Sequence, residues 1–141
     1  MSVVRVFNRQ RGHRVDSKRL AALATRAFPH ALAVRTRPDV PLAGLDLVEV
    51  SIVSDGAIAR VHGDFFDDPT PTDVITFDHG EILVSADTAL ENSARFDTSQ
   101  EDELALYIIH GLLHLAGWED DENEETVAMS MHQDAILQKV L

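Results

Sequence analysis

The sequence predicts an α/β (or α+β) fold in which four to six helices pack on a small mixed sheet of four strands. Short apolar or alternating segments have the length of strands, and longer segments with apolar residues at helical spacing separate them. Neither of the first two strands is followed by a close hairpin partner, which favours a mixed sheet. With 141 residues, 45% of them hydrophobic, the chain can bury one core, and we expect one domain over residues 1–141.

The first half of the chain alternates between strand and helix patterns. Asp16 has the character of an N-cap, because its side chain can accept hydrogen bonds from the free N–H groups of a helix, and apolar residues follow it at helical spacing. Pro38 and Pro41 mark a loop. The predicted elements are a strand over residues 3–7, a helix from Asp16 through Phe28, a strand over residues 45–53 and a short helix over residues 55–62.

The second half is predicted to contain a proline-rich loop, two short strands and three helices. Ser99, with Asp102 three residues later, has the form of a capping box and opens the helix that carries two histidines. We expect the last helix to bury Val127, Ala128, Met131 and Ala135. The predicted elements are a loop over 67–71, strands over 74–77 and 81–84 around a turn at 78–80, and helices over 85–92, from 99 onward and over 124–139.

Charge is distributed very unevenly along the chain, whose net charge is −12. Residues 1–40 hold nine of the twelve Lys and Arg residues and two acids, a local net charge of +7, whereas residues 41–141 carry −19. The basic first segment is therefore the part of the chain that can contact phosphate. The alternative interpretation is a solvated helix with an arginine-rich loop.

Composition also indicates where in the cell the protein is expected to be. The chain has no cysteine, which excludes disulfides and thiolate metal sites. Arginines precede any apolar run near the start, and the longest low-charge run, residues 104–118, is shorter than a membrane span. We expect a soluble, cytoplasmic protein.

The stretch HGLLHLAGWED, from His110 to Asp120, predicts a metal site. His110 and His114 lie one turn apart on one helix face, so both imidazoles can reach one ion. Gly117 can take a positive φ and end the helix, which would bring Asp120 to the same ion. Two nitrogens and one oxygen suit one Zn²⁺ per chain and leave a fourth position for water, as is typical of catalytic zinc.

Other interpretations of this stretch remain open. The histidines could be core residues hydrogen-bonded to backbone, with Asp120 part of a solvated acidic run before the last helix. Glu119 or Asp121 could replace Asp120 as the third ligand. Gly111 stands where zinc peptidases of the HExxH type carry their general base, so the sequence argues against peptide hydrolysis. A glycine here indicates the close approach of either a neighbouring strand or a substrate.

Two motifs resemble those of the YbeY family, metal-dependent single-strand endoribonucleases involved in ribosomal RNA maturation. HGLLHLAGWED is similar to that family's HGxLHLxGYDH signature, and residues 71–77, PTDVITF, are similar to its PTDVLSF. Gly80-Glu81-Ile82 follows where the family has a glycine and an acid opening a strand. The motifs lie at the expected separation, and the element order from Leu45 onward fits, so the resemblance covers roughly two thirds of the chain or more.

The resemblance implies a zinc ion in a cleft, ligated through His110 and His114, with Asp120 in place of the family's usual third histidine. It also implies an arginine near the cleft, but that position falls on Phe66. Arg60 is followed by 34 residues without Lys or Arg. Either Arg60 or the basic first segment replaces the missing cation, or nuclease activity is reduced.

Three more residues near the motifs allow two interpretations each. Asp73 either orients a ligand histidine or serves ordinary turn chemistry. His62 either contacts substrate or is a half-exposed bystander. Trp118 either packs beneath the turn or stacks on a base.

The function that the resemblance implies is a zinc-dependent endoribonuclease acting on single-stranded RNA. Its expected substrate is the 3′ end of small-subunit ribosomal RNA, with the small ribosomal subunit as a partner and neither membrane nor DNA expected. The sequence assigns no catalytic general base. The alternatives are a non-catalytic or weakly active ribosome-assembly factor that keeps a structural metal, and a hydrolase acting on a small metal-bound substrate.

Overall fold

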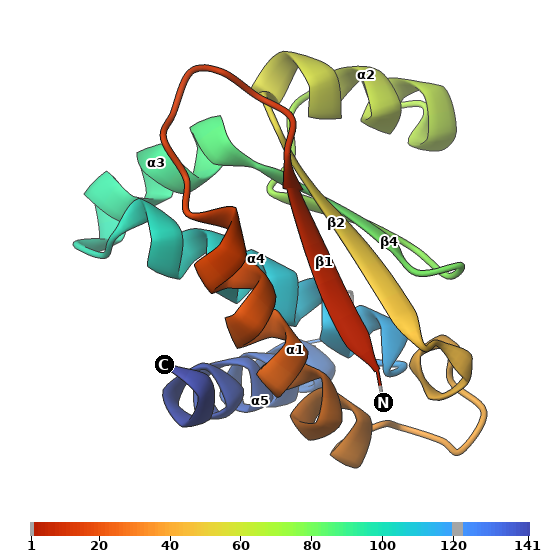
Figure 1. The fold of residues 1–141 in the computed structure, drawn as a ribbon. Helices are drawn as coiled ribbons and strands as arrows, with labels where there is room; N and C mark the ends of the chain where they lie inside the picture. Colours follow the sequence, from red (N-terminus) through yellow and green to blue (C-terminus); the bar gives the residue numbers. More distant parts are fainter. Residues whose placement is uncertain (1, 120–122) are drawn as a thin grey trace.

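The structure is a computed structural model that describes residues 2–119 and 123–141. Within that part of the chain, four strands form one mixed sheet in the order β1-β2-β4-β3 (Figure 1). This confirms the predicted fold class. Strands β1, β2 and β4 run parallel, and β3 pairs antiparallel with β4. The strands are β1 (Val3–Asn8), β2 (Leu47–Val53), β3 (Val74–Phe77) and β4 (Glu81–Ser85).

Side-chain caps begin the first four α-helices. The side-chain oxygens of Asp16, Ser54, Ser85 and Ser99 each accept a hydrogen bond from a backbone N–H in the first turn that follows. None of the helices in the described part of the chain has both the length and the apolar character needed to span a bilayer. The helices are α1 (Ser17–Ala33), the 3₁₀ turn η1 (Pro41–Gly44), α2 (Asp55–Phe66), α3 (Ala86–Phe96), α4 (Gln100–Leu115) and α5 (Asn123–Val140).

The two faces of the sheet carry different cores because successive side chains of a strand point to opposite faces. On β2, Val48, Val50 and Ile52 belong to the main core, which α1, α4 and α5 also line. Val53, the next residue, belongs to a smaller cluster on the other face, where Ile58 of α2 packs. Helix α2 accordingly lies apart from the other helices, at the top of Figure 1.

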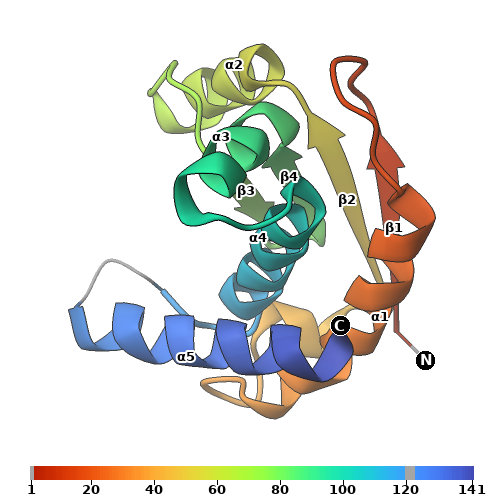
Figure 2. The same cartoon turned by 90° about the vertical axis from the view of Figure 1, so that its left-hand side faces the viewer.

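Helix α4 is the central element of the helical layer. Figure 2 shows it with α3 above and α5 below. Its Gly111 faces Ile82 of β4, and a Cβ at this glycine would lie 2.9 Å from Ile82 Cδ1 and 3.0 Å from Ile82 Cγ2. Of the two interpretations of this glycine, the structure therefore supports the close approach of a neighbouring strand. The close contact places the histidine-bearing helix directly against the sheet.

The buried face of α5 differs from the predicted one. Val127 and Met131 are exposed at 61% and 67% of their surface, and Ala135 is also exposed. The buried positions are instead Met129 and Ile136, with Val140 near the end of the helix. Apolar residues occur on several sides of this helix, so spacing alone did not identify the side that packs on α1 and α4.

Candidate functional site

His110 and His114 meet on one face of α4, as the sequence predicts. Their Nε2 atoms are 3.0 Å apart, and their ring centroids are 4.5 Å apart with the planes at 86°. Both residues are partly buried, at the end of the helix nearest the sequence Gly117-Trp118. The two imidazoles therefore present the same nitrogen to one point in space.

The opposite nitrogens of both rings are held by oxygens. His110 Nδ1 donates to Gln133 Oε1 of α5 at 2.7 Å, and His114 Nδ1 donates to the backbone oxygen of Trp118 at 2.8 Å. In a neutral imidazole, a proton on Nδ1 places the ring's lone pair on Nε2. Oxygen partners of this kind fix the tautomer and orientation of metal-binding histidines.

This donor set fits a zinc ion. Two Nε2 lone pairs that face each other at 3.0 Å repel unless a proton or a cation lies between them. Two nitrogens bound at about 2.0–2.1 Å to one tetrahedral ion would stand about 3.3 Å apart, close to the spacing observed. The histidine half of the predicted site therefore has the separation and tautomers that such an ion needs.

The third predicted ligand, Asp120, lies outside the described residues. Among residues 2–119 and 123–141, no group of three or more metal-ligating side chains comes together. The turn that leads to Asp120 does have the predicted form: Gly117 has φ +98°, and Trp118 N donates to Leu113 O at 3.0 Å. A Cβ at Gly117 would meet the side chain of Thr36.

A cleft of about 420 Å³ opens beside His114. Three segments wall it: the end of α4, the α2–β3 region, and the loop that joins α1 to η1. Its volume is that of an ordinary small-ligand site. The described residues that line it are Arg37, Pro41, His62, Phe66, Thr72, Val74, Ile75, Thr76, Asp78, His114, Gly117, Trp118 and Glu119.

Arg37 brings a guanidinium to this cleft from the basic first segment. Among the described lining residues it is the one Lys or Arg, whereas Arg60 is exposed on α2 and does not line the cleft. Its Nε atom is 3.2 Å from Asp39 Oδ1, and its side chain is 56% exposed. Phe66, at the position where the resemblance would have placed an arginine, lines the α2 side of the cleft instead. Sequence reasoning had pointed to the first segment without identifying the residue.

The loop that carries Arg37 is fixed to the end of α4. Thr36 N donates to Ala116 O at 3.0 Å, and Trp118 Nε1 donates to Val34 O at 2.9 Å. The indole also lies 4.9 Å from the ring of His132 on α5. The structure therefore supports the packing interpretation of Trp118, which joins the histidine wall of the cleft to the arginine wall.

Asp73 serves the turn before β3. Its Oδ1 accepts from its neighbour Val74 N at 2.8 Å, and its backbone oxygen accepts from Ser85 N of β4 at 3.0 Å. These contacts favour ordinary turn chemistry over a bond to a ligand histidine. Nearby, Thr76 Oγ1 is buried and has no hydrogen-bond partner among the described residues.

His62 holds the loop between α2 and β3. Its Nδ1 donates to Thr70 O at 2.8 Å, and its side chain is 21% exposed. In the same loop the Thr70 hydroxyl and backbone N–H both donate to Asp68, and the hydroxyl above all lowers the pKa of that carboxyl. His62 is therefore a cleft residue that also orders the loop.

Comparison with known proteins identifies the same family as the histidine motif and the motif at residues 71–77. The family model described as Endoribonuclease YbeY matches residues 5–141. The chain belongs to the YbeY family. The sequence resemblance to this family is thereby confirmed.

Individual YbeY relatives match over part of their length. An Endoribonuclease YbeY from Protochlamydia amoebophila is 36% identical over 95 residues, which are 60% of this chain and 63% of that relative. One from Chlorobaculum tepidum is 35% identical over 100 residues, 66% of this chain and 73% of that relative. The first match thus spans less than two thirds of the relative's own length.

A solved structure is similar to this chain over nearly its whole length. The solution structure of TM1509 from Thermotoga maritima superposes with a TM-score of 0.64 at 29% sequence identity. The superposition covers 97% of this chain and 88% of the other.

Proposed function

We propose that the protein is a zinc-dependent endoribonuclease that cleaves single-stranded RNA in ribosomal RNA maturation. The observation that carries this proposal is the pair of converging Nε2 atoms on α4, 3.0 Å apart, at the side of a cleft that Arg37 also lines. Membership of a family described as endoribonucleases supports the reaction class. The 3′ end of small-subunit ribosomal RNA, in contact with the small subunit, is the substrate that the resemblance implies.

Each wall of the cleft has a distinct role in the proposed reaction. His110 and His114 would hold the zinc ion, and Asp120 is the proposed third ligand. A bound zinc ion supplies Lewis-acid chemistry at a phosphodiester. Arg37 binds a backbone phosphate, because a guanidinium presents several N–H donors to phosphate oxygens at once. Its bond to Asp39 is exposed and therefore weak enough to exchange for phosphate.

Metal analysis tests the histidine pair directly. We expect about one zinc ion per purified chain. Removal of one imidazole by His114→Ala should abolish zinc loading, whereas His30→Ala, a histidine on α1 outside the cleft, should leave it unchanged. Full zinc content in His114→Ala would contradict the site.

Cleavage tests the activity itself. The zinc-loaded protein should cut single-stranded ribosomal RNA, chelator should stop the reaction, and added zinc should restore it. Undiminished cleavage after complete metal removal would overturn the metal-dependent nuclease.

One observation favours a second candidate, a non-catalytic ribosome-assembly factor with a structural metal. Phe66 stands where the family resemblance implies an arginine, so the α2 side of the cleft offers no cation at that position. This candidate predicts association with the small subunit without RNA cleavage. Full biological function of an Asp120→Ala variant would support it over the nuclease.

A further inference from the structure

Aromatic rings gather at the rim of the cleft, between the end of α2 and the β3–β4 turn. Phe66 lies 6.4 Å from Phe77, and Phe77 lies 5.6 Å from His79 with the two planes only 20° apart. We call Phe66, Phe77 and His79 the ring cluster. Phe65 contacts Phe77 from the side, edge to face at 5.2 Å, and His62 lies 5.9 Å from Phe66 on the inner side.

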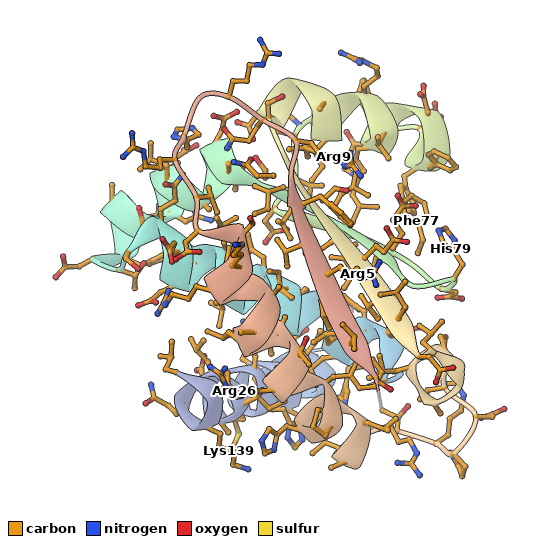
Figure 3. The ribbon with its side chains drawn as sticks, in the orientation of Figure 1. Arg5, Arg9, Arg26, Phe77, His79 and Lys139 are labelled. Carbon is orange, nitrogen blue, oxygen red and sulfur yellow. The ribbon has the colours of Figure 1, made fainter. Side chains whose placement is uncertain are left out.

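Two of the three rings are exposed, whereas Phe77 between them is half-buried against the smaller core cluster. Phe66 is 53% exposed, and the His79 side chain is 69% exposed. Burying a phenylalanine fully is worth about 1.5–3 kcal/mol, so packing in the core explains Phe77 but not the exposed ring of Phe66 beside it. Figure 3 shows Phe77 and His79 projecting together at the edge of the sheet, away from Arg26 and Lys139.

The ring cluster is continuous with the proposed active site. Phe66 belongs to it and also lines the cleft that His114 and Arg37 line. A single strand whose phosphate reached Arg37 would therefore have its adjoining bases beside these rings. Two acids border this path: Asp78 lines the cleft, and Glu81 Oε1 lies 3.0 Å from His79 Nε2.

Cations of the first segment lie farther along the same face of the sheet. Arg5, Glu49, Glu81 and Phe77 stand in one row of the strand register, so their side chains share the face opposite the main core. Arg9 lies on the same side, as Figure 3 shows. Within that row, Glu49 and Glu81 stand between Arg5 and Phe77, so the open-face arginines lie two strands beyond the rings.

We propose that the ring cluster is a base-stacking platform that holds unpaired bases of an RNA strand as it leaves the cleft. This inference rests on the proposed endoribonuclease function and names the residues that select a single strand. Aromatic side chains bind bases of single strands by stacking, which tolerates any sequence because every base has a π-face. A duplex keeps its bases stacked inside, where these rings cannot reach them.

Binding of a short single-stranded RNA with 2-aminopurine at successive positions tests the platform. Chelator in the buffer prevents cleavage. Phe66→Leu keeps an apolar side chain but removes the ring, and it should weaken binding by about 5- to 100-fold, the range expected for loss of one base stack. Phe66→Trp should retain binding. Phe96→Leu is the matched control, because Phe96 is 62% exposed on α3 and outside the cleft.

An abasic position provides the second measurement. When the base that meets Phe66 is missing from the RNA, wild-type protein should bind more weakly, and the difference between wild type and Phe66→Leu should disappear. Wild-type quenching of 2-aminopurine at that position should also be lost in Phe66→Leu. These results together would identify stacking rather than a general loss of fold.

The outcomes separate the platform from the proposed function. If wild-type protein cleaves single-stranded RNA but Phe66→Leu and Phe96→Leu bind it equally well, the platform is overturned and the nuclease stands. If wild-type protein neither binds nor cleaves single-stranded RNA, both proposals fall. Equal binding of a duplex of the same sequence would also overturn the platform.

Discussion

Gly111, between the two histidines, sets how closely their helix approaches the sheet. The space that a Gly111 side chain would need is occupied by Ile82, which is fully buried and cannot easily move away. Glycine inside a helix normally costs about 1 kcal/mol relative to alanine. Here that cost is offset by contact between α4 and β4.

We therefore expect Gly111→Ala to destabilise the protein by about 1–2 kcal/mol, because crowding in a packed core outweighs the gain in helix propensity. Denaturant unfolding measures this free energy. In an Ile82→Val background, which removes Cδ1, the cost of Gly111→Ala should shrink.

Gly44→Ala is the control for this pair, since nothing lies within 4 Å of a Cβ built at Gly44. It should leave the free energy of unfolding nearly unchanged. A Gly111→Ala protein more stable than wild type would show that the contact with Ile82 relaxes freely.

Sequence patterns predicted the histidine pair and the positive φ of Gly117, because both follow from local helical geometry. They could not identify Arg37 as the cleft cation. Its position depends on how the loop after α1 docks on the end of α4, a contact between segments some 80 residues apart. The same limit applies to Gln133, the partner of His110 from α5.

At the scale of elements, α3 and α4 pack as a pair through Tyr107. This side chain is 5% exposed, and its hydroxyl oxygen accepts from Asn92 Nδ2 at 2.6 Å. Burial raises the pKa of Tyr107 to about 12, with only partial opposition from the Asn92 hydrogen bond. The packing of α3 on α4 therefore favours the neutral phenol.

Alkaline titration of phenolate absorbance tests this packing, and Tyr107 is the one tyrosine of the chain. The folded protein should ionise near pH 12 and the denatured protein near the ordinary value of about 10. Because the folded pKa is raised, the stability from neutral Tyr107 is fully present below pH of about 10 and is lost as pH rises toward about 12.

Tyr107→Phe should lose less stability than wild type over that alkaline range, since it has no proton to release. A folded protein whose tyrosine titrates like that of the denatured chain would contradict the buried α3–α4 contact.

Element by element, the capped helices were predictable and the buried face of α5 was not. Asp16 and Ser99 signal helix starts by chemistry that acts within one turn. In α5 the apolar residues do not form a single stripe, and only contact with α1 and α4 selects Met129 and Ile136. Helix ends were also underestimated, as α2 continues to Phe66.

At the scale of the whole molecule, a net charge of −12 coexists with a basic first segment. Of that segment, Arg37 lines the cleft, and Arg5 and Arg9 lie on the open face of the sheet. Phosphate can therefore meet local positive charge while the acidic remainder repels RNA that approaches elsewhere.

The proposed RNA binding should consequently weaken as salt increases, because contacts between phosphate and arginine release counterions. Each phosphate contact on a single strand contributes a slope of about −0.7 to log K against log salt. We expect Arg37→Ala to make the slope shallower by about 0.7. Arg60→Ala, an exposed residue outside the cleft, should leave it unchanged.

Binding that strengthens with salt, or identical slopes for wild type and Arg37→Ala, would exclude a phosphate contact at Arg37. A slope change in Arg60→Ala instead would assign the contact to the other candidate cation.

The hydrogen bonds from Thr36 and Trp118 tie the arginine loop to the last turn of the histidine helix. Loss of either hydrogen bond would displace the histidine pair and Arg37 together, so its effect could not be divided between the proposed metal binding and the proposed phosphate contact. Epistasis is the expected signature: once the indole anchor is gone, removing the guanidinium should do little additional harm. A substitution that changes one wall of the cleft should therefore keep these hydrogen bonds intact, or the opposite wall will move as well.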